Sequence, residues 1–148
     1  MGFPALSGSI EEPRAERLRV LVVDDDALFR ASVVRLMSQD HAIVEVHDGG
    51  EALERLEIGA PYDVVLLDLH MPHPNGIEVY EALRTAYPWL ADDIVVVTAG
   101  ASSREEEEFL DSIPNECLRK PFTRRELLAA IERSARRVRG NPSGVLYP

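Results

Sequence analysis

Aspartate residues gather where two apolar runs of the chain end. The run LRVLVV ends in Asp24, Asp25 and Asp26, with no lysine or arginine directly after them. The run VVLL ends in Asp68. Carboxylates a few ångströms apart repel one another by roughly 4 kcal/mol per pair at an effective dielectric near 20. Carboxylate oxygens are also the ligands that Mg²⁺ prefers, although this ion takes only one or two of them directly. The pattern therefore predicts a magnesium site made of Asp24, Asp25 and Asp68.

Two further polar residues stand at equivalent points of the chain. Thr98 ends the run IVVV, and Lys120 follows CLR. Each is weak evidence alone, because Lys120 could be a surface lysine and Thr98 the cap of a strand end. Together with the aspartates they form a set suited to phosphoryl transfer, in which Lys120 supplies a mobile cation, Thr98 a hydroxyl donor and Asp68 the nucleophile. The lysine would also compensate part of the crowded negative charge.

Alternating strands and helices are the elements that must position these residues. Strands are predicted at 18–23, 42–46, 62–67, 94–98 and 116–119, and helices at 26–38, 51–58, 77–86, 104–112 and 124–137. Continuous apolar runs are typical of strands buried on both faces of a parallel sheet. We therefore predict an α/β fold with a five-stranded parallel sheet, doubly wound in the flavodoxin-like (βα)5 arrangement with helices on both faces. Ligands of such sheets bind beyond the carboxyl ends of the strands, where the candidate residues fall.

Three helix starts carry capping signals. Ser102 with Glu105, and Thr123 with Glu126, match a capping box. Asp26 is better explained as the cap of the first helix than as a direct metal ligand, because aspartate is a preferred residue at that position. We therefore leave Asp26 out of the predicted metal site.

Composition indicates a single globular domain. The chain has 148 residues, 45% of them apolar and 28% charged, and we assign 18–138 to this domain, with a flexible leader at 1–17 and a flexible tail at 139–148. The net charge of −10 argues against direct nucleic-acid binding. Cys117 is the single cysteine, which excludes an intrachain disulfide. The sequence contains neither an apolar run of about 18 residues nor a secretory signal, so we expect a cytoplasmic protein with no membrane contact.

Four motifs follow one another at the predicted strand ends, in the order VLVVDDD, VVLLDLHMPHPNG, VVVTAG and CLRKPF. Thr98 lies 30 residues after Asp68, and Lys120 lies a further 22 residues along the chain. This combination resembles the receiver domain of two-component response regulators. One motif alone would be weak evidence, whereas all four in order are highly specific. The resemblance covers residues 18–138, roughly four fifths of the chain.

The resemblance implies a role for the acidic residues. Asp68 would accept a phosphoryl group from a phosphohistidine of a histidine kinase or a histidine phosphotransfer protein. Asp25 and Asp68 would bind Mg²⁺ directly and Asp24 through water, and the backbone carbonyl of His70 would complete the protein ligands. Such a domain catalyses only its own phosphorylation and dephosphorylation, so we do not expect an enzyme with a separate substrate. Weak association between copies of the chain is compatible with this interpretation.

The resemblance also implies a conformational switch that relays the signal. Thr98 would contact a phosphoryl oxygen and move on phosphorylation, and the small Ala99 beside it would leave room for the phosphoryl group. Lys120 would bridge to that group, and the Lys120–Pro121 bond is expected to be cis, a geometry that is inexpensive only before proline. Gly76 fits the turn that closes the loop after the acceptor.

One departure and several alternatives accompany this interpretation. Cys117 stands where receivers commonly carry a tyrosine or phenylalanine whose rotation accompanies the movement of the threonine.

The main alternative is a phosphate-independent receiver-like interaction module, which would have lost the acceptor, the acids or the lysine. A phosphatase of the haloacid-dehalogenase type would need an aspartate where His70 stands, and a zinc site at His70 and His73 lacks further soft ligands. We expect no output domain after residue 138, and therefore a free-standing regulator or the terminal receiver of a hybrid sensor kinase.

Overall fold

A parallel sheet forms the centre of the computed structural model, which describes residues 17–58 and 62–139. The strands formed by these residues are β1 (Arg19–Val23), β2 (Ala42–Val46), β3 (Val64–Asp68), β4 (Ile94–Thr98) and β5 (Cys117–Arg119). They pair in the order β2-β1-β3-β4-β5, and every pair is parallel. The predicted parallel sheet is therefore confirmed. The predicted leader and tail lie outside the described residues, apart from Arg17 and Arg139.

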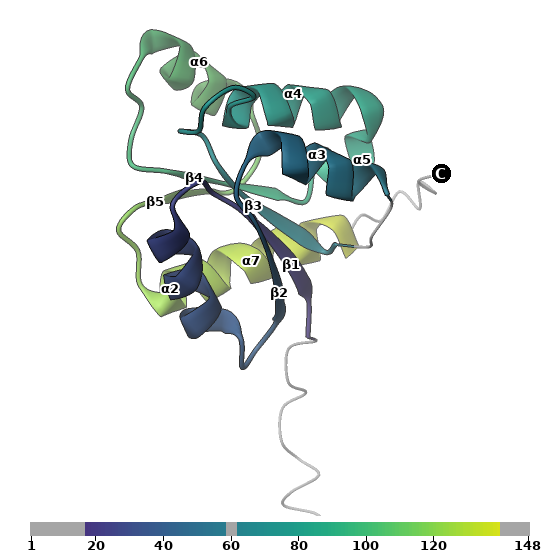
Figure 1. Ribbon diagram of the computed structural model, residues 1–148, viewed down its shortest axis with the longest axis vertical. Helices are drawn as coiled ribbons and strands as arrows, with labels where there is room; N and C mark the ends of the chain where they lie inside the picture. Colours follow the sequence, from purple (N-terminus) through teal and green to yellow (C-terminus); the bar gives the residue numbers. More distant parts are fainter. Residues whose placement is uncertain (1–16, 59–61, 140–148) are drawn as a thin grey trace, which may run out of the picture.

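Helices cover both faces of this sheet (Figure 1). In the described part of the chain they are α2 (Ala27–Met37), α3 (Gly49–Glu57), α4 (Gly76–Ala86), α5 (Pro88–Ala91), α6 (Arg104–Ser112) and α7 (Arg124–Arg139). Helices α2 and α7 lie on one face, and α3 to α6 lie on the other. The doubly wound prediction is confirmed. The short helix α5 lies outside the predicted helices, although Pro88 suits its first helical position.

Alternation along the strands divides the apolar core into two layers. In β3, Val65 and Leu67 pack in the layer that holds α3 to α6, together with Tyr80 of α4. Val64 and Leu66 pack in the other layer, which α2 and α7 cover. Successive side chains of a strand point to opposite faces, so a strand covered on both faces needs apolar residues at every position. This requirement explains the continuous apolar runs of the sequence.

The pairing of the strands brings the candidate residues to one edge of the sheet. Strands β1 and β3 are neighbours in register, so Asp24, which follows β1, lies close to Asp68, which ends β3. Strand β5 continues its pairing with β4 beyond its last residue, because the Lys120 backbone N–H donates to the Thr98 carbonyl at 2.8 Å. The fold therefore carries Asp24, Asp68, Thr98 and Lys120 at its carboxyl edge.

Hydrogen bonds at the helix starts confirm two of the three capping predictions. Asp26 caps α2 by accepting from two backbone N–H groups of the first turn, at 3.0 and 3.4 Å. Thr123 and Glu126 form the predicted reciprocal box, with 3.1 Å in each direction. The third prediction is wrong by one residue. Ser103 rather than Ser102 caps α6, because the Ser102 hydroxyl donates to a glutamate side chain of that helix instead.

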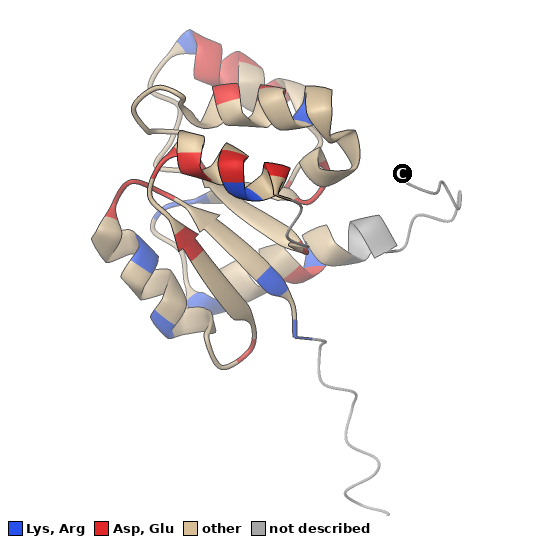
Figure 2. Cartoon of the chain, turned by 45° about the vertical axis from the view of Figure 1, so that its right-hand side comes forward, with Lys and Arg blue, Asp and Glu red and all other residues tan. Residues whose placement is uncertain are grey.

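Charged residues are unevenly distributed over the helices. Figure 2 shows acidic residues concentrated on α6, which begins with the run REEEE, whereas α2 carries arginines. Acidic residues in the first turn suit the positive end of the helix dipole. No helix in the described ranges is both long enough and apolar enough to cross a membrane.

Candidate functional site

Three carboxylates meet where β1 and β3 end. One oxygen atom each from Asp24, Asp25 and Asp68 lies within 4.8 Å of the other two. Asp24 and Asp68 are buried, whereas Asp25 is exposed at the rim. Parallel neighbours end at the same edge, so residues 44 positions apart in the sequence become adjacent. The structure thus brings together the three residues that the sequence analysis assigned to a metal site.

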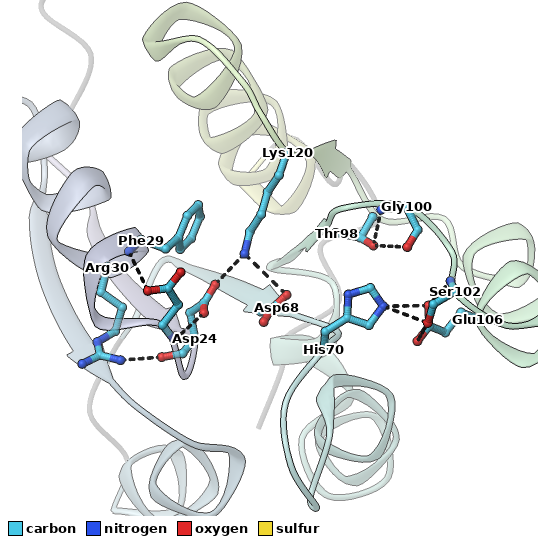
Figure 3. A network of polar contacts seen from close by, with 11 residues as sticks. Asp24, Phe29, Arg30, Asp68, His70, Thr98, Gly100, Ser102, Glu106 and Lys120 are labelled. Atoms are coloured by element: carbon cyan, nitrogen blue, oxygen red, sulfur yellow. Dashed lines mark hydrogen bonds and ion pairs between the residues drawn. The ribbon is translucent and has the colours of Figure 1, made fainter.

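Lys120 reaches into this cluster from the far end of the chain (Figure 3). Its Nζ lies 2.9 Å from Asp24 Oδ2 and 3.7 Å from Asp68 Oδ1. The Lys120–Pro121 bond is cis, as predicted. One ammonium group faces two buried carboxylates while a third carboxylate lies close by, so these four side chains carry excess negative charge.

The excess charge is reflected in Asp68. Burial raises the pKa of Asp68 from its usual 3.8 to about 6, and the neighbouring Asp24 carboxylate adds to the rise. Lys120 and a hydrogen bond from the His70 backbone N–H act in the opposite direction. A raised pKa here means that burial and the neighbouring carboxylate destabilise the ionised form more than Lys120 and the His70 N–H stabilise it. At neutral pH the ionised form still prevails, as a carboxylate nucleophile requires.

The donor set fits a hard divalent cation. Three carboxylates offer only oxygen ligands, which Mg²⁺ prefers. Asp24, Asp25 and Asp68 would hold the ion, whose charge would offset the cost of burying the Asp68 carboxylate and its repulsion by Asp24. The backbone carbonyl of His70 stays a predicted further ligand. Asp26 is engaged as the cap of α2, in keeping with its omission from the predicted metal site.

Thr98 ends β4 as predicted, but its hydroxyl is engaged with its own loop. Thr98 Oγ1 accepts a hydrogen bond from the Gly100 N–H (3.0 Å) and donates to the Gly100 carbonyl (3.2 Å). Gly100 has φ of +124°, and a Cβ built there would lie 3.2 Å from Nη2 of Arg119. Glycine suits this conformation, which side chains disfavour. The predicted contact of Thr98 with a phosphoryl oxygen therefore requires the hydroxyl to exchange its Gly100 partners.

The side chain of His70 extends the site to α6. Its Nε2 lies 2.8 Å from Glu106 Oε2 and 3.4 Å from Ser102 Oγ. A carboxylate only accepts hydrogen bonds, so Nε2 must carry the proton. From the sequence, only the backbone carbonyl of His70 is predicted to take part in the site. The ring contact could not be foreseen, because Glu106 is 36 residues away in the chain.

Gly76 closes the loop that follows Asp68, as predicted. Its backbone N–H donates to the Leu69 carbonyl at 3.2 Å. A Cβ built on Gly76 would lie only 2.3 Å from the Asp68 carbonyl oxygen, so only glycine allows this close approach. The His73–Pro74 bond in the same loop is also cis, which the sequence analysis did not predict.

Two residues of α2 belong to the site although they were not predicted. Arg30 Nη1 donates to the Asp24 backbone carbonyl at 2.7 Å, and its Nε lies 3.4 Å from Glu45 Oε1. The ring of Phe29 lies against Lys120, with Nζ 3.9 Å from the ring centroid. Their position in the sequence could have indicated this, because the first turn of a helix that directly follows the acidic motif lies near that motif. Arg30 also supplies a positive charge beside the aspartates.

Comparisons with known proteins agree on one family. A family model described as the response regulator receiver domain matches residues 20–132. The response regulator MprA of Mycobacterium ulcerans (strain Agy99) is 41% identical to this chain over 125 residues, which cover 82% of this chain and 52% of the relative. The chain therefore spans about half the length of the curated relatives that it matches.

Solved structures give the same result. The chemotaxis protein CheY4 of Vibrio cholerae is similar with a TM-score of 0.69 and 28% identity, covering 80% of this chain and 99% of that one. The receiver domain of the Francisella response regulator 1452 is similar with a TM-score of 0.69 and 28% identity, covering 82% of this chain and 98% of that one. Both solved chains are thus matched over nearly their whole length.

Proposed function

This chain belongs to the family of response regulator receiver domains, and we propose that it acts as a phospho-acceptor through Asp68. The phosphoryl group would come from a phosphohistidine of a histidine kinase or a histidine phosphotransfer protein, in a reaction that depends on Mg²⁺. The observation that carries the proposal is the position of Lys120, whose Nζ lies 2.9 Å from Asp24 and 3.7 Å from Asp68. A cation held beside a buried carboxylate nucleophile suits the negative charge of an incoming phosphoryl group.

The proposed chemistry is a displacement at phosphorus. A carboxylate oxygen of Asp68 forms the new P–O bond while the P–N bond to the donor imidazole breaks, and the bonding electron pair leaves with the imidazole. The Lys120 ammonium stabilises the negative charge on the phosphoryl oxygens. Mg²⁺, when bound by Asp24, Asp25 and Asp68, supplies further neutralisation of these oxygens. The domain would thus catalyse only its own phosphorylation and dephosphorylation.

Thr98 would report the modification to the rest of the domain. The new phosphoryl oxygens are strong acceptors, and hydrogen bonds to charged acceptors are stronger than those to a neutral carbonyl. The Thr98 hydroxyl would therefore leave the Gly100 carbonyl, to which it now donates at 3.2 Å. Gly100 lies in the loop that leads to α6, so this exchange would alter the start of that helix.

Intact-mass measurement after incubation with acetyl phosphate and Mg²⁺ tests the proposal. The wild-type chain should gain one phosphoryl group, and Asp68→Asn should gain none. Asp111→Asn is the matched control, because it makes the same chemical change at an exposed position of α6. Labelling of Asp68→Asn to the wild-type level would overturn the assignment of the acceptor. A wild-type chain that gains no phosphoryl group from acetyl phosphate or from phosphohistidine donors would favour the phosphate-independent interaction module.

A further inference from the structure

Lys120 has a neighbour of a different kind from the two carboxylates, the ring of Phe29. Nζ lies 3.9 Å from the ring centroid, and Figure 3 shows the ring beside the end of the lysine side chain. The face of a phenyl ring carries partial negative charge and attracts a cation, more strongly when water is partly excluded. Only 25% of the Lys120 side chain is exposed, so this condition is met. The ammonium is therefore held by a neutral group as well as by two acids.

The two carboxylates that contact Lys120 are also candidate metal ligands. Asp24 and Asp68 both belong to the carboxylate cluster that fits a divalent cation. Positive charge added to that cluster weakens the attraction between these carboxylates and the Lys120 ammonium. Phe29 offers no metal ligand, so its attraction for the ammonium persists when the carboxylates are engaged. Without such a partner, the long and flexible lysine side chain would turn its strongly hydrated ammonium toward water.

Packing in the apolar core does not by itself explain why position 29 carries an aromatic ring. Phe29 is only half buried. Its ring packs edge to face against Phe122, with centroids 5.8 Å apart and an interplanar angle of 87°. The ring borders an open cavity of about 420 Å³, whose lining consists of Phe29, Ser32, Leu36, Lys120, Pro121 and Phe122. A leucine would make similar apolar contacts beside this open cavity, whereas only an aromatic residue offers a ring face to the ammonium.

We propose that Phe29 is a positioning residue of the phosphoryl site, whose ring keeps the Lys120 ammonium beside Asp68 when the carboxylates are engaged by a cation. This inference rests on the proposed function, because that function assigns the Lys120 ammonium the role of stabilising the charge on the phosphoryl group. Phe29 itself touches neither Asp68 nor the phosphoryl group in this proposal. It acts through Lys120.

Phosphorylation kinetics of three variants test the proposal. With acetyl phosphate and saturating Mg²⁺, Phe29→Leu should lower the phosphorylation rate about fivefold, the size expected for loss of one cation–π contact. Phe29→Tyr keeps the ring face and should stay within about twofold of wild type. Phe122→Leu is the matched control, since it removes a ring from the same cavity but not the one against the ammonium. Mg²⁺ affinity, measured by calorimetry, should be the same in all four proteins. A wild-type rate in Phe29→Leu, or an equal loss in Phe122→Leu, would overturn the proposal.

A second readout does not depend on phosphorylation. Lys120 is the only lysine of the chain, so selective ¹³C labelling of lysine gives the signals of one side chain. The ring should shift the ε-CH₂ protons of Lys120 upfield in the wild type and in Phe29→Tyr, and this shift should survive saturation with Mg²⁺. Phe29→Leu should lose it. Loss of the upfield shift in the wild type on adding Mg²⁺ would show that the ring does not hold the ammonium. If the wild type accepts no phosphate, the proposed function fails, and these signals still decide whether Phe29 positions Lys120.

Discussion

The imidazole of His70 and the carboxylate of Glu106 join the acceptor loop directly to α6. His70 Nε2 lies 2.8 Å from Glu106 Oε2, although 36 residues separate the two in the sequence. The His70 backbone N–H donates to the carboxylate of Asp68, so one residue contacts both the acceptor and α6. The Ser102 hydroxyl strengthens the junction, because it donates to Glu106 Oε1 at 3.1 Å. A change at Asp68 therefore has a short route to the start of α6 that does not pass through β5.

Removal of the His70 ring should uncouple the two segments. We expect His70→Ala to reduce the amide chemical-shift changes that beryllofluoride, a phosphoryl mimic, causes at residues 104–108. The free energy of unfolding should fall by only about 0.5 kcal/mol, because the net contribution of one partly exposed hydrogen bond is small. Arg104→Ala is the control, since it removes the Arg104–Glu108 pair from the same helix without touching the acceptor loop. Unchanged shifts at 104–108 in His70→Ala would exclude this route.

Asp68→Asn should stabilise the chain at neutral pH in the absence of Mg²⁺. The pKa of Asp68 in the fold is about 6, above its usual 3.8, so the native state binds this proton more tightly than the unfolded state. The stabilisation by the protonated form is complete below about pH 4 and is lost as pH rises through about 6. The variant should therefore gain up to about 3 kcal/mol at pH 7.5 and almost nothing at pH 4. Urea unfolding at the two pH values measures this difference. A gain that is equal at both values would contradict the assigned cause.

Measurements of magnesium binding should distinguish the roles of the adjacent residues Asp25 and Asp26. Asp25 belongs to the carboxylate cluster, so Asp25→Ala should abolish Mg²⁺ binding measured by calorimetry. Asp26 caps α2, so Asp26→Ala should bind Mg²⁺ nearly as the wild type does and lose about 1 kcal/mol of unfolding free energy. If Asp26→Ala were the variant that lost the metal, the division of roles between the two residues would be wrong.

His41 should make the fold sensitive to acid at the opposite end of β1. Its Nδ1 accepts the backbone N–H of Leu18 at 3.1 Å, so the buried ring is neutral in the native state. Burial lowers the pKa of His41 below 6.5, and the charged groups around it partly oppose one another. These groups are Asp40, Glu132 and Asp63, which raise the pKa, and Arg17, which lowers it.

Because the pKa of His41 is lower in the fold, its contribution to stability is present above about pH 6.5 and is lost as pH falls below that value. His41→Asn keeps an acceptor for the Leu18 N–H without a titrating ring. The stability advantage of the wild type over His41→Asn should therefore shrink between pH 7 and pH 5. Parallel curves of unfolding free energy against pH would show that His41 does not titrate in this range.

The location of the site could be predicted from the sequence because it follows from chain topology. Asp24, Asp68 and Thr98 stand at or just after the end of an apolar run, and Lys120 follows the short segment CLR. Parallel strands bring such ends to one edge. The cap at Asp26 could also be predicted, because it depends on a residue preference and on local backbone bonds alone.

The orientation of side chains could not be predicted, because it depends on neighbours far away in the sequence. The Thr98 hydroxyl turns to Gly100, whose loop is covered by Arg119 of the next strand. The contact of Phe29 with Lys120 joins α2 to the segment after β5, about ninety residues later. Neither a periodic pattern nor a motif records such pairs, so these contacts appear only in three dimensions.

The position of Cys117 bears on how far the signal travels. Cys117 lies exposed on β5, and its Sγ is 3.6 Å from the Asn115 carbonyl. The Cys117 thiol cannot fill the space that Thr98 would leave on moving toward a phosphoryl group. The phosphorylated and unphosphorylated forms would therefore differ by fewer contacts around β5. A ligand shifts an equilibrium only by its differential contacts with the two states. We therefore expect beryllofluoride to change amide shifts mainly in the loops after Asp68 and Thr98 and at the start of α6.

Substitution of a ring at this position gives the sharpest form of the prediction. Cys117→Tyr should extend the beryllofluoride-dependent shifts across residues 116–137, because the ring can follow Thr98 and then contact α6 and α7 differently in the two states. Cys117→Ser is the matched control, since it keeps the size of the side chain and should behave as the wild type does. All three proteins should accept phosphate at similar rates, because the acceptor, the acids and the lysine are unchanged. Large shifts across 116–137 already present in the wild type would mean that another side chain performs the role of the aromatic residue.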